Sequence, residues 1–261
     1  MKTLLSTTCA VLVFCQTGQT ALILSDLQTN GGGDPSWQST GQTTQPGWFA
    51  EEAAIVTNST TLALTPTASG LAAGIGATMV SSQNWTSRGG TNPNNRMPVT
   101  GTSFDSVVSD LWSSPSMSFS ISFTGLTVGA NYRIRTWHND SYLLNQGFAA
   151  GGGIVTPSIS GGTVVSSANG TVTNLRGAQT DAAFGIADLQ FIATISNPLV
   201  TYLRTGGDIT ALPVNGVEFT GPESAAVPEP GQVAASLVLL AGIGGYVFLK
   251  RRKAAKAPAA A

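Results

Sequence analysis

Residues 118–124 read Ser118-Phe119-Ser120-Ile121-Ser122-Phe123-Thr124, with a large apolar side chain at every second position. Successive side chains of a β-strand point to opposite faces of a sheet, so this pattern predicts a strand with one buried face and one hydroxyl-bearing face. A turn with glycine at both ends, 125–129, follows this stretch. The next segment, 132–137, alternates again. Two alternating runs joined by such a turn predict neighbouring antiparallel strands.

Within this second run, Tyr132, Ile134 and Thr136 share one predicted face, and Arg133, Arg135 and Trp137 share the other. Further strand-like runs are 62–64, 189–195, 200–202 and 217–219, separated by Gly, Pro, Asn and Asp. Segment 105–112 has apolar residues at helical spacing and predicts a short helix. The central region of about 200 residues is long enough for one core. The predicted fold is therefore mainly β, an antiparallel β-sandwich.

Two stretches are similar to known extracellular domains. Gly125–Arg135 is similar to the strand turn of fibronectin type III modules and galactose-binding-like jelly rolls, and Leu212–Phe219 is similar to the closing strand of galactose-binding-like domains. The stretch from Tyr132 to Phe219 is longer than an immunoglobulin-like module of about 100 residues needs. The resemblance therefore implies a jelly-roll-like sandwich.

Charge is scarce and unevenly placed along the chain. Hydrophobic residues make up 42% of the 261 residues and charged residues 10%, with a net charge of −1. Between Leu22 and Glu223, six arginines stand against twelve acidic residues, which gives −6, and lysine is absent. A broad basic face for nucleic acid is therefore not expected. The low charge also argues against a disordered chain and is typical of exported bacterial surface proteins.

The N-terminus has the pattern of a secretory signal peptide. Lys2 precedes a short apolar stretch, 4–14, and small residues between Gly18 and Ala21 offer a cleavage site. We therefore assign residues 1–21 to the signal peptide. Both cysteines lie within it, so the mature chain is expected to hold no disulfide. The alternative, a lipoprotein with Cys15 lipidated, is disfavoured by the bulky residue that precedes it.

Three features follow one another at the C-terminus. They are Val227-Pro228-Glu229-Pro230-Gly231, an uncharged apolar stretch at 233–249, and the basic cluster Lys250, Arg251, Arg252 and Lys253. As a helix, the apolar stretch would be about 25 Å long, near the minimum for crossing a bilayer. A basic cluster next to a membrane helix stays on the cytoplasmic side, so the rest of the chain is expected outside.

This arrangement resembles the PEP-CTERM sorting signal of exported Gram-negative proteins, with Pro228, Glu229 and Pro230 as its motif. The resemblance covers about the last thirty-five residues and implies recognition and processing by an exosortase. The prolines would keep the motif extended and open to a protease. The alternative is a simple membrane anchor with an incidental motif. The resulting division is a surface domain at 22–223, a sorting signal at 224–253 and a short cytoplasmic tail at 254–261.

A dense polar and aromatic segment offers the best candidate binding site. Its members are Arg135, Trp137, His138, Asn139 and Asp140. Trp137 could stack on a sugar ring while its polar neighbours bind hydroxyls, because binding sites often lie on loops of a rigid scaffold. The alternative is that Trp137 packs in the core and the next residues form an ordinary turn.

Catalytic and metal motifs are weak in this sequence. The single histidine could serve a Ser-His-Asp triad, but no Gly-x-Ser-x-Gly elbow is present. A metal site of clustered His and Cys is excluded for the mature chain. A structural calcium ion is conceivable, with Asp26, Asp34, Asp181, Asp188 and Glu218 as candidate ligands. Beyond that ion, no cofactor is expected.

These patterns predict a non-enzymatic protein with a structural or adhesive role in the envelope or exopolysaccharide matrix. Its expected route is export, anchoring in the inner membrane by the C-terminal helix, and release or attachment after exosortase processing. Two alternatives stay open: a lectin-like module that binds polysaccharide on the same anchor, and a secreted hydrolase.

Overall fold

The structure is a computed structural model, and it describes residues 19–29, 44–53, 59–88, 99–104, 111–140, 152–175, 177–207 and 211–222. The chain divides into two units, one ending at Pro222 and the other spanning Glu223–Ala261. The first eighteen residues, the Pro-Glu-Pro motif, the predicted membrane helix and the basic cluster lie outside the described residues. No helix within those ranges is long and apolar enough to cross a membrane.

One of the two large sheets, sheet A, contains six strands in the order β11-β14-β9-β17-β1-β2. Their bounds are β11 Gly162–Ala168, β14 Ile186–Ala193, β9 Asn131–Trp137, β17 Gly216–Pro222, β1 Gln19–Thr29 and β2 Phe49–Ala53. Neighbouring strands are antiparallel, except that β1 and β2 run parallel.

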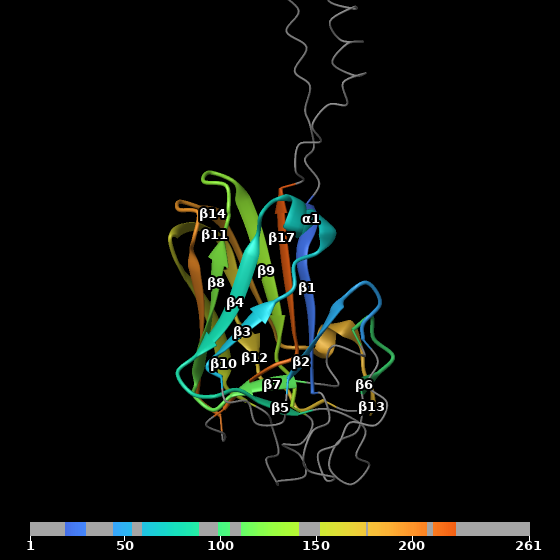
Figure 1. Ribbon diagram of the computed structural model, residues 1–261. Helices are drawn as coiled ribbons and strands as arrows, with labels where there is room; N and C mark the ends of the chain where they lie inside the picture. Colours follow the sequence, from blue (N-terminus) through green and yellow to red (C-terminus); the bar gives the residue numbers. More distant parts are fainter. Residues whose placement is uncertain are drawn as a thin grey trace, which may run out of the picture. The chain divides into compact units, whose positions relative to one another are not determined.

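The second large sheet, sheet C, has the order β12-β10-β15-β8-β4-β3 and is antiparallel throughout. Its bounds are β12 Gly170–Thr171, β10 Ile154–Ser160, β15 Leu199–Thr205, β8 Ser118–Thr124, β4 Gly76–Ser81 and β3 Thr61–Leu64. Figure 1 shows the long strands of the two sheets running side by side as two layers.

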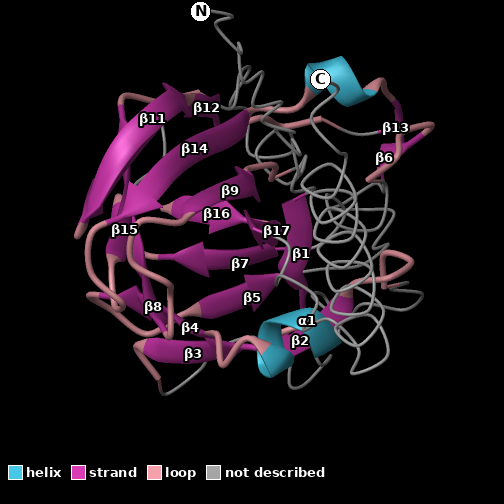
Figure 2. Ribbon diagram, turned by 90° about the horizontal axis from the view of Figure 1, so that it is seen from above, coloured by secondary structure: helices cyan, strands magenta, loops and turns pink. Residues whose placement is uncertain are grey.

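Smaller elements complete the domain. Sheet B consists of β16 (Leu212–Val214), β7 (Leu111–Ser114) and β5 (Thr86–Arg88), and sheet D pairs β13 (Gly177–Ala178) with β6 (Val99–Thr100). The short helices are α1 (Ala68–Ala72) and the 3-10 helix η2 (Asp181–Ala183). Figures 1 and 2 show β5 and β7 lying across one end of the sandwich, whereas Figure 1 shows α1 at the other end.

Aromatic side chains from both sheets form the core. Phe123 of β8 stacks on Phe219 of β17 with ring centroids 4.3 Å apart, which joins sheet C to sheet A. Tyr132 of β9 stacks on the same Phe219 at 5.4 Å. All three side chains are buried, with exposed fractions of 2% or less. Burial of each such ring stabilises the fold by roughly 1.5–3 kcal/mol, so the alternating pattern explains why these segments fold as strands.

The predicted mainly β fold with antiparallel sheets is confirmed. Strand β8 has the bounds that the alternating run predicts, and β9 begins one residue earlier than predicted. The helix predicted at 105–112 is wrong at its end, because Leu111 begins strand β7; its first six residues lie outside the described ranges. At residues 111–112, the backbone pairs with β5 and β16 instead of forming the hydrogen bonds of a helix.

The two ends of the domain meet. Strand β1 pairs antiparallel with β17, and the register places Gln19 opposite Pro222, Thr20 opposite Gly221 and Ala21 opposite Thr220. The predicted signal-peptide boundary after Ala21 therefore falls inside β1. At the same end, the Thr67 hydroxyl accepts a hydrogen bond from the Gly70 amide as the cap of α1 and donates one to the Ala21 carbonyl oxygen at 2.8 Å.

Candidate functional site

Trp137 stands on the outward face of sheet A, on the same side of β9 as Arg133 and Arg135. The register aligns it with Gly216 of β17 and, one strand further, with Asp26 of β1. It is nevertheless fully buried. A second cluster of apolar residues covers it, in which Trp48, Phe104 and Phe184 take part with Leu175 and Ile186. Trp137 is therefore a packing residue of this second cluster, which lies apart from the main core.

The segments that cover Trp137 are held together by hydrogen bonds. The Gln45 side-chain amide donates to the Ser103 carbonyl oxygen at 2.9 Å, and both the amide and the hydroxyl of Ser103 donate to the Asp181 carboxylate at 2.8 Å. Above the ring, Trp48 and Phe104 lie with centroids 5.4 and 4.9 Å from Trp137. With its ring enclosed, Trp137 offers no free face for stacking on a sugar in this arrangement.

Asp26 anchors this cover to the sheet. One carboxylate oxygen, Oδ2, accepts hydrogen bonds from the Gln45 backbone amide at 2.8 Å and from Gln28 Nε2 at 3.2 Å. The other, Oδ1, is buried and has no hydrogen-bond partner. Burial raises the pKa of Asp26 from 3.8 to about 6, against the opposing effect of those two hydrogen bonds.

His138 lies inside the domain, with 1% of its surface exposed. Its Nδ1 is 2.7 Å from the carbonyl oxygen of Pro213, and its Nε2 is 2.9 Å from the hydroxyl of Thr136. A carbonyl only accepts, so the network assigns the proton to Nδ1, and Nε2 accepts from the hydroxyl. Burial lowers the pKa of His138 to about 4; the Pro213 carbonyl opposes this, and the charge of Arg204 adds to it.

Asn139 joins three parts of the chain. Its backbone amide donates to Asn215 Oδ1 at 2.5 Å, and Asn215 Nδ2 donates back to its carbonyl oxygen at 3.0 Å. Its side-chain oxygen accepts from the Thr173 hydroxyl and the Leu175 amide, and its Nδ2 donates to the Leu175 carbonyl oxygen. The Asp140 amide donates to the Thr173 carbonyl oxygen at 2.8 Å. The residues after Trp137 are therefore a buried junction of three segments.

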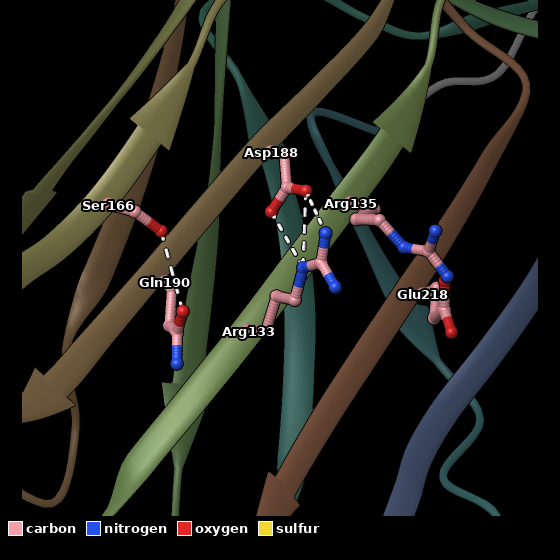
Figure 3. A network of polar contacts seen from close by, with 6 residues as sticks. All are labelled: Arg133, Arg135, Ser166, Asp188, Gln190 and Glu218. Carbon is pink, nitrogen blue, oxygen red and sulfur yellow. Dashed lines mark hydrogen bonds and ion pairs between the residues drawn. The ribbon is translucent and has the colours of Figure 1, made fainter. Parts of the chain in front are cut away.

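A half-buried strip of polar side chains crosses the outward face of sheet A, and we call it the polar strip. It consists of Ser166, Gln190, Asp188, Arg133, Arg135 and Glu218, from β11, β14, β9 and β17 (Figure 3). Arg133 holds Asp188 with two donor nitrogens, Nε and Nη2, and the Nε hydrogen bond to Oδ1 is 2.9 Å long. The Ser166 hydroxyl donates to Gln190 Oε1 at 3.4 Å.

Arg135 belongs to this strip and also borders the covered tryptophan. Its guanidinium pairs with the Glu218 carboxylate through Oε2. This contact is ionic, because Oε2 has no partner in hydrogen-bond geometry. The guanidinium carbon also lies 5.6 Å from the Trp137 ring centroid, a cation–π distance. Of the five predicted site residues, Arg135 alone therefore stays partly accessible, with 29% of its side chain exposed.

The candidate calcium ligands have separate protein partners. Asp188 pairs with Arg133, Glu218 with Arg135, and Asp181 with Ser103, as described above, and Asp34 lies outside the described residues. Among the residues that the structure describes, no group of three or more His, Cys, Asp or Glu side chains could hold a metal ion.

Sequence reasoning missed the pairing of Arg133 with Asp188 and the part played by Gln190. Alternation does place Arg133 and Arg135 on one face, but the order of strands in the sheet decides which acidic residues lie beside them. Sequence spacing gives no signal for that order, because β14 and β17 follow β9 by about 50 and 80 residues.

No family model matches the chain, and no curated protein is significantly similar to it in sequence.

Proposed function

We propose that this chain is an exported bacterial surface protein, displayed by its C-terminal segment and processed there by an exosortase-type enzyme, with a structural or adhesive role in the envelope or exopolysaccharide matrix. We also propose a jelly-roll-like connectivity for the sandwich. The route to the surface is suggested by the signal-peptide pattern, the Pro-Glu-Pro motif, the apolar stretch 233–249 and the basic cluster.

The observation that carries the proposal is the pairing of Gln19 with Pro222. Because the domain begins and ends at the same place, removal of the leader and processing after Pro222 would both occur at one end of the sandwich. Processing after Pro222 would leave β17 intact, and cleavage at the Gly18 end of the predicted range would leave β1 intact as well. The rest of the domain would extend away from the attachment point, as a displayed module requires.

Intact mass spectrometry of the full chain, produced in a Gram-negative host that contains an exosortase, tests this proposal. We expect the native protein to begin between Gln19 and Leu22, within the predicted cleavage range, and to end near Pro230. Glu229→Ala is expected to leave the chain ending at Ala261, whereas Glu223→Ala, an acidic residue of the same segment outside the motif, is expected to be processed normally. A native chain that still ends at Ala261 would instead support a simple anchor.

A second candidate function, binding of a polysaccharide, is favoured by the polar strip. The ion pairs fix the orientation of Arg133 and Arg135, and Arg133 lies between the Gln190 amide and Arg135 on this partly accessible face. Four neighbouring strands at a spacing of about 4.8 Å make the strip roughly 15 Å long. Such a row of fixed donors and acceptors suits the hydroxyl groups of a sugar chain.

Affinity electrophoresis in gels that contain dextran, a galactan or the host exopolysaccharide tests this second function. Arg133→Met keeps much of the aliphatic stem but removes the charged donors, so we expect at least tenfold weaker binding, about the value of one charged hydrogen bond. Asn131→Ala, on the same face of β9 but outside the strip, is the control. Equal migration of both variants and the original protein would exclude the strip as a sugar site.

A further inference from the structure

We propose that the outward face of sheet C is the surface through which two copies of this chain associate. The inference concerns the folded domain and does not depend on how the chain is sorted. It rests on the side chains that the strand register brings together on this face, on their charge and on the size of the face.

The register of sheet C arranges its outward side chains in rows across the strands. One row is Ser158, Thr201, Ser120, Val80 and Thr61. The next is Ser160, Leu199, Ser122, Thr78 and Ala63, and a shorter third row is Thr156, Leu203 and Ser118. The residues between them on each strand, such as Phe119 and Tyr202, are buried in the core, so the rows face outward.

These rows contain hydroxyl and aliphatic side chains but no charged residue. The outward face of sheet A, in contrast, has two arginines and two acidic residues in the polar strip. Because residues 22–223 have a net charge of −6, copies of the domain repel each other over most approaches. The outward face of sheet C is a surface across which two copies can meet without placing like charges together.

The chemistry of the face also suits a second copy of the same chain. In a two-fold interface, a residue near the axis meets its own counterpart. A hydroxyl group donates and accepts, so it pairs with an identical hydroxyl, whereas a charged group repels its counterpart. Ser120 and Thr201, whose hydroxyl oxygens are 2.9 Å apart, stand at the middle of the first row. Leu199 and Leu203, 39% and 48% exposed, add apolar surface beside them.

The face is also large enough for a specific contact. Five strands of four to seven residues, about 4.8 Å apart and with a rise of about 3.3 Å per residue, give a flat area of roughly 500 Å². Two copies would together bury roughly 1,000 Å² or more, near the lower limit of specific protein interfaces. We therefore expect a weak dimer, in the micromolar range, between individual domains.

Sedimentation velocity of the full chain in mild detergent, over a range of concentrations, tests the inference. We expect a reversible dimer for the original protein. Thr201→Asp and Thr201→Lys should each weaken it at least tenfold, because like charges then meet near the axis. Mixing the two variants should restore a heterodimer, which a folding defect could not explain. Asn131→Asp and Asn131→Lys, on the outward face of sheet A, should leave the dimer unchanged.

Cross-linking in membranes gives an independent measurement. With Cys9 and Cys15 replaced by alanine, Ser120→Cys should give a dimer band with a bis-maleimide, and Asn131→Cys should not. A chain that stays monomeric at all concentrations would overturn the inference. So would a dimer that both Thr201 variants leave intact, since another part of the chain must then form it. Binding of a polysaccharide to this face by a monomeric chain would overturn it as well.

Discussion

Asn139 and Asn215 bind each other reciprocally: the backbone amide of Asn139 donates to the side-chain oxygen of Asn215, and the Asn215 side-chain amide donates to the Asn139 carbonyl oxygen. Asn215 also accepts the Leu27 backbone amide on its own carbonyl oxygen, and its backbone amide donates to the Trp137 carbonyl oxygen. One asparagine thus links the end of β9 to β1 where β16 passes into β17.

Replacement of Asn215 by alanine is expected to lower the free energy of unfolding by about 2–4 kcal/mol. The substitution removes the two hydrogen bonds between the Asn215 side chain and the Asn139 backbone, and the loss of such bonds at buried polar groups is costly. Urea unfolding followed by tryptophan fluorescence measures the change. Asn197→Ala, an exposed asparagine in the turn before β15, should change stability by less than about 0.5 kcal/mol. A loss of similar size in both variants would show that the junction has no special role.

Asp26→Asn is expected to stabilise the domain at neutral pH. The pKa of Asp26 is raised from 3.8 to about 6, so the folded state binds the proton more tightly than the unfolded state. The contribution of Asp26 to stability is therefore most favourable below pH 4 and falls as pH rises to about 6, by about 3 kcal/mol. The amide removes the buried charge and still accepts from the Gln45 amide.

The gain should accordingly be about 3 kcal/mol at pH 7 and near zero at pH 3.5, measured by chemical denaturation at each pH. Gln28→Glu, which adds a carboxylate next to Asp26 Oδ2, serves as the opposite variant and should destabilise most strongly at neutral pH. A pH-independent gain from Asp26→Asn would contradict the assigned cause.

The protonation of His138 changes stability with pH in the opposite direction to that of Asp26. Its pKa is lowered to about 4 in the folded state, from 6.5 in the unfolded state. The unfolded state therefore binds more protons between pH 6.5 and 4, and stability is lost as pH falls through that window. In the original protein this loss is partly offset by Asp26, whose effect runs the other way between pH 6 and 4.

The Asp26→Asn variant should therefore lose stability steeply between pH 6.5 and 4, by about 3 kcal/mol, whereas the original protein changes little. Addition of His138→Gln to Asp26→Asn should lower stability at every pH, because the buried network is disturbed, but should remove most of the slope. Denaturation curves at four or five pH values test this, and a persistent slope in the double variant would show that another group titrates.

Gly125 and Gly129, the two glycines of the turn after β8, give a matched pair of substitutions. Both have positive φ, +79° and +83°, which disfavours any side chain. A methyl group on Gly125 would also lie 2.1 Å from the Gly74 carbonyl oxygen, whereas nothing lies within 4 Å of one on Gly129. Gly129→Ala should lower stability by about 1–2 kcal/mol, and Gly125→Ala by clearly more. Equal melting temperatures for the two variants would contradict the clash.

Local alternation predicted several of the strands that face the core, but not β1, β4 or β10. The stretch at 118–124 matches β8 because every second residue is large and apolar. Strand β1 was not predicted, since its first residues join the apolar leader and a register shift between Ala21 and Ile23 breaks the alternation. Helix α1 was missed because a five-residue segment without large buried side chains has no helical pattern.

The candidate site depends on contacts between distant segments, which local patterns do not predict. Alternation correctly placed Trp137 beside Arg133 and Arg135 on the outward face of β9. The side chain is buried because Trp48, Phe104 and Phe184 arrive from segments far away in the sequence. The same holds for Asn139, whose partners lie 36 and 76 residues further along the chain. Contacts of this range depend on the order of strands, which no local pattern contains.

The position of β17 between β9 and β1 has a mechanical consequence. A pull on the segment after Pro222 enters the domain along β17, and the ladders on both sides of this strand resist it at once. Such a load shears many hydrogen bonds together instead of unzipping them singly. A domain pulled through its C-terminus would therefore resist the force better than one pulled through an edge strand.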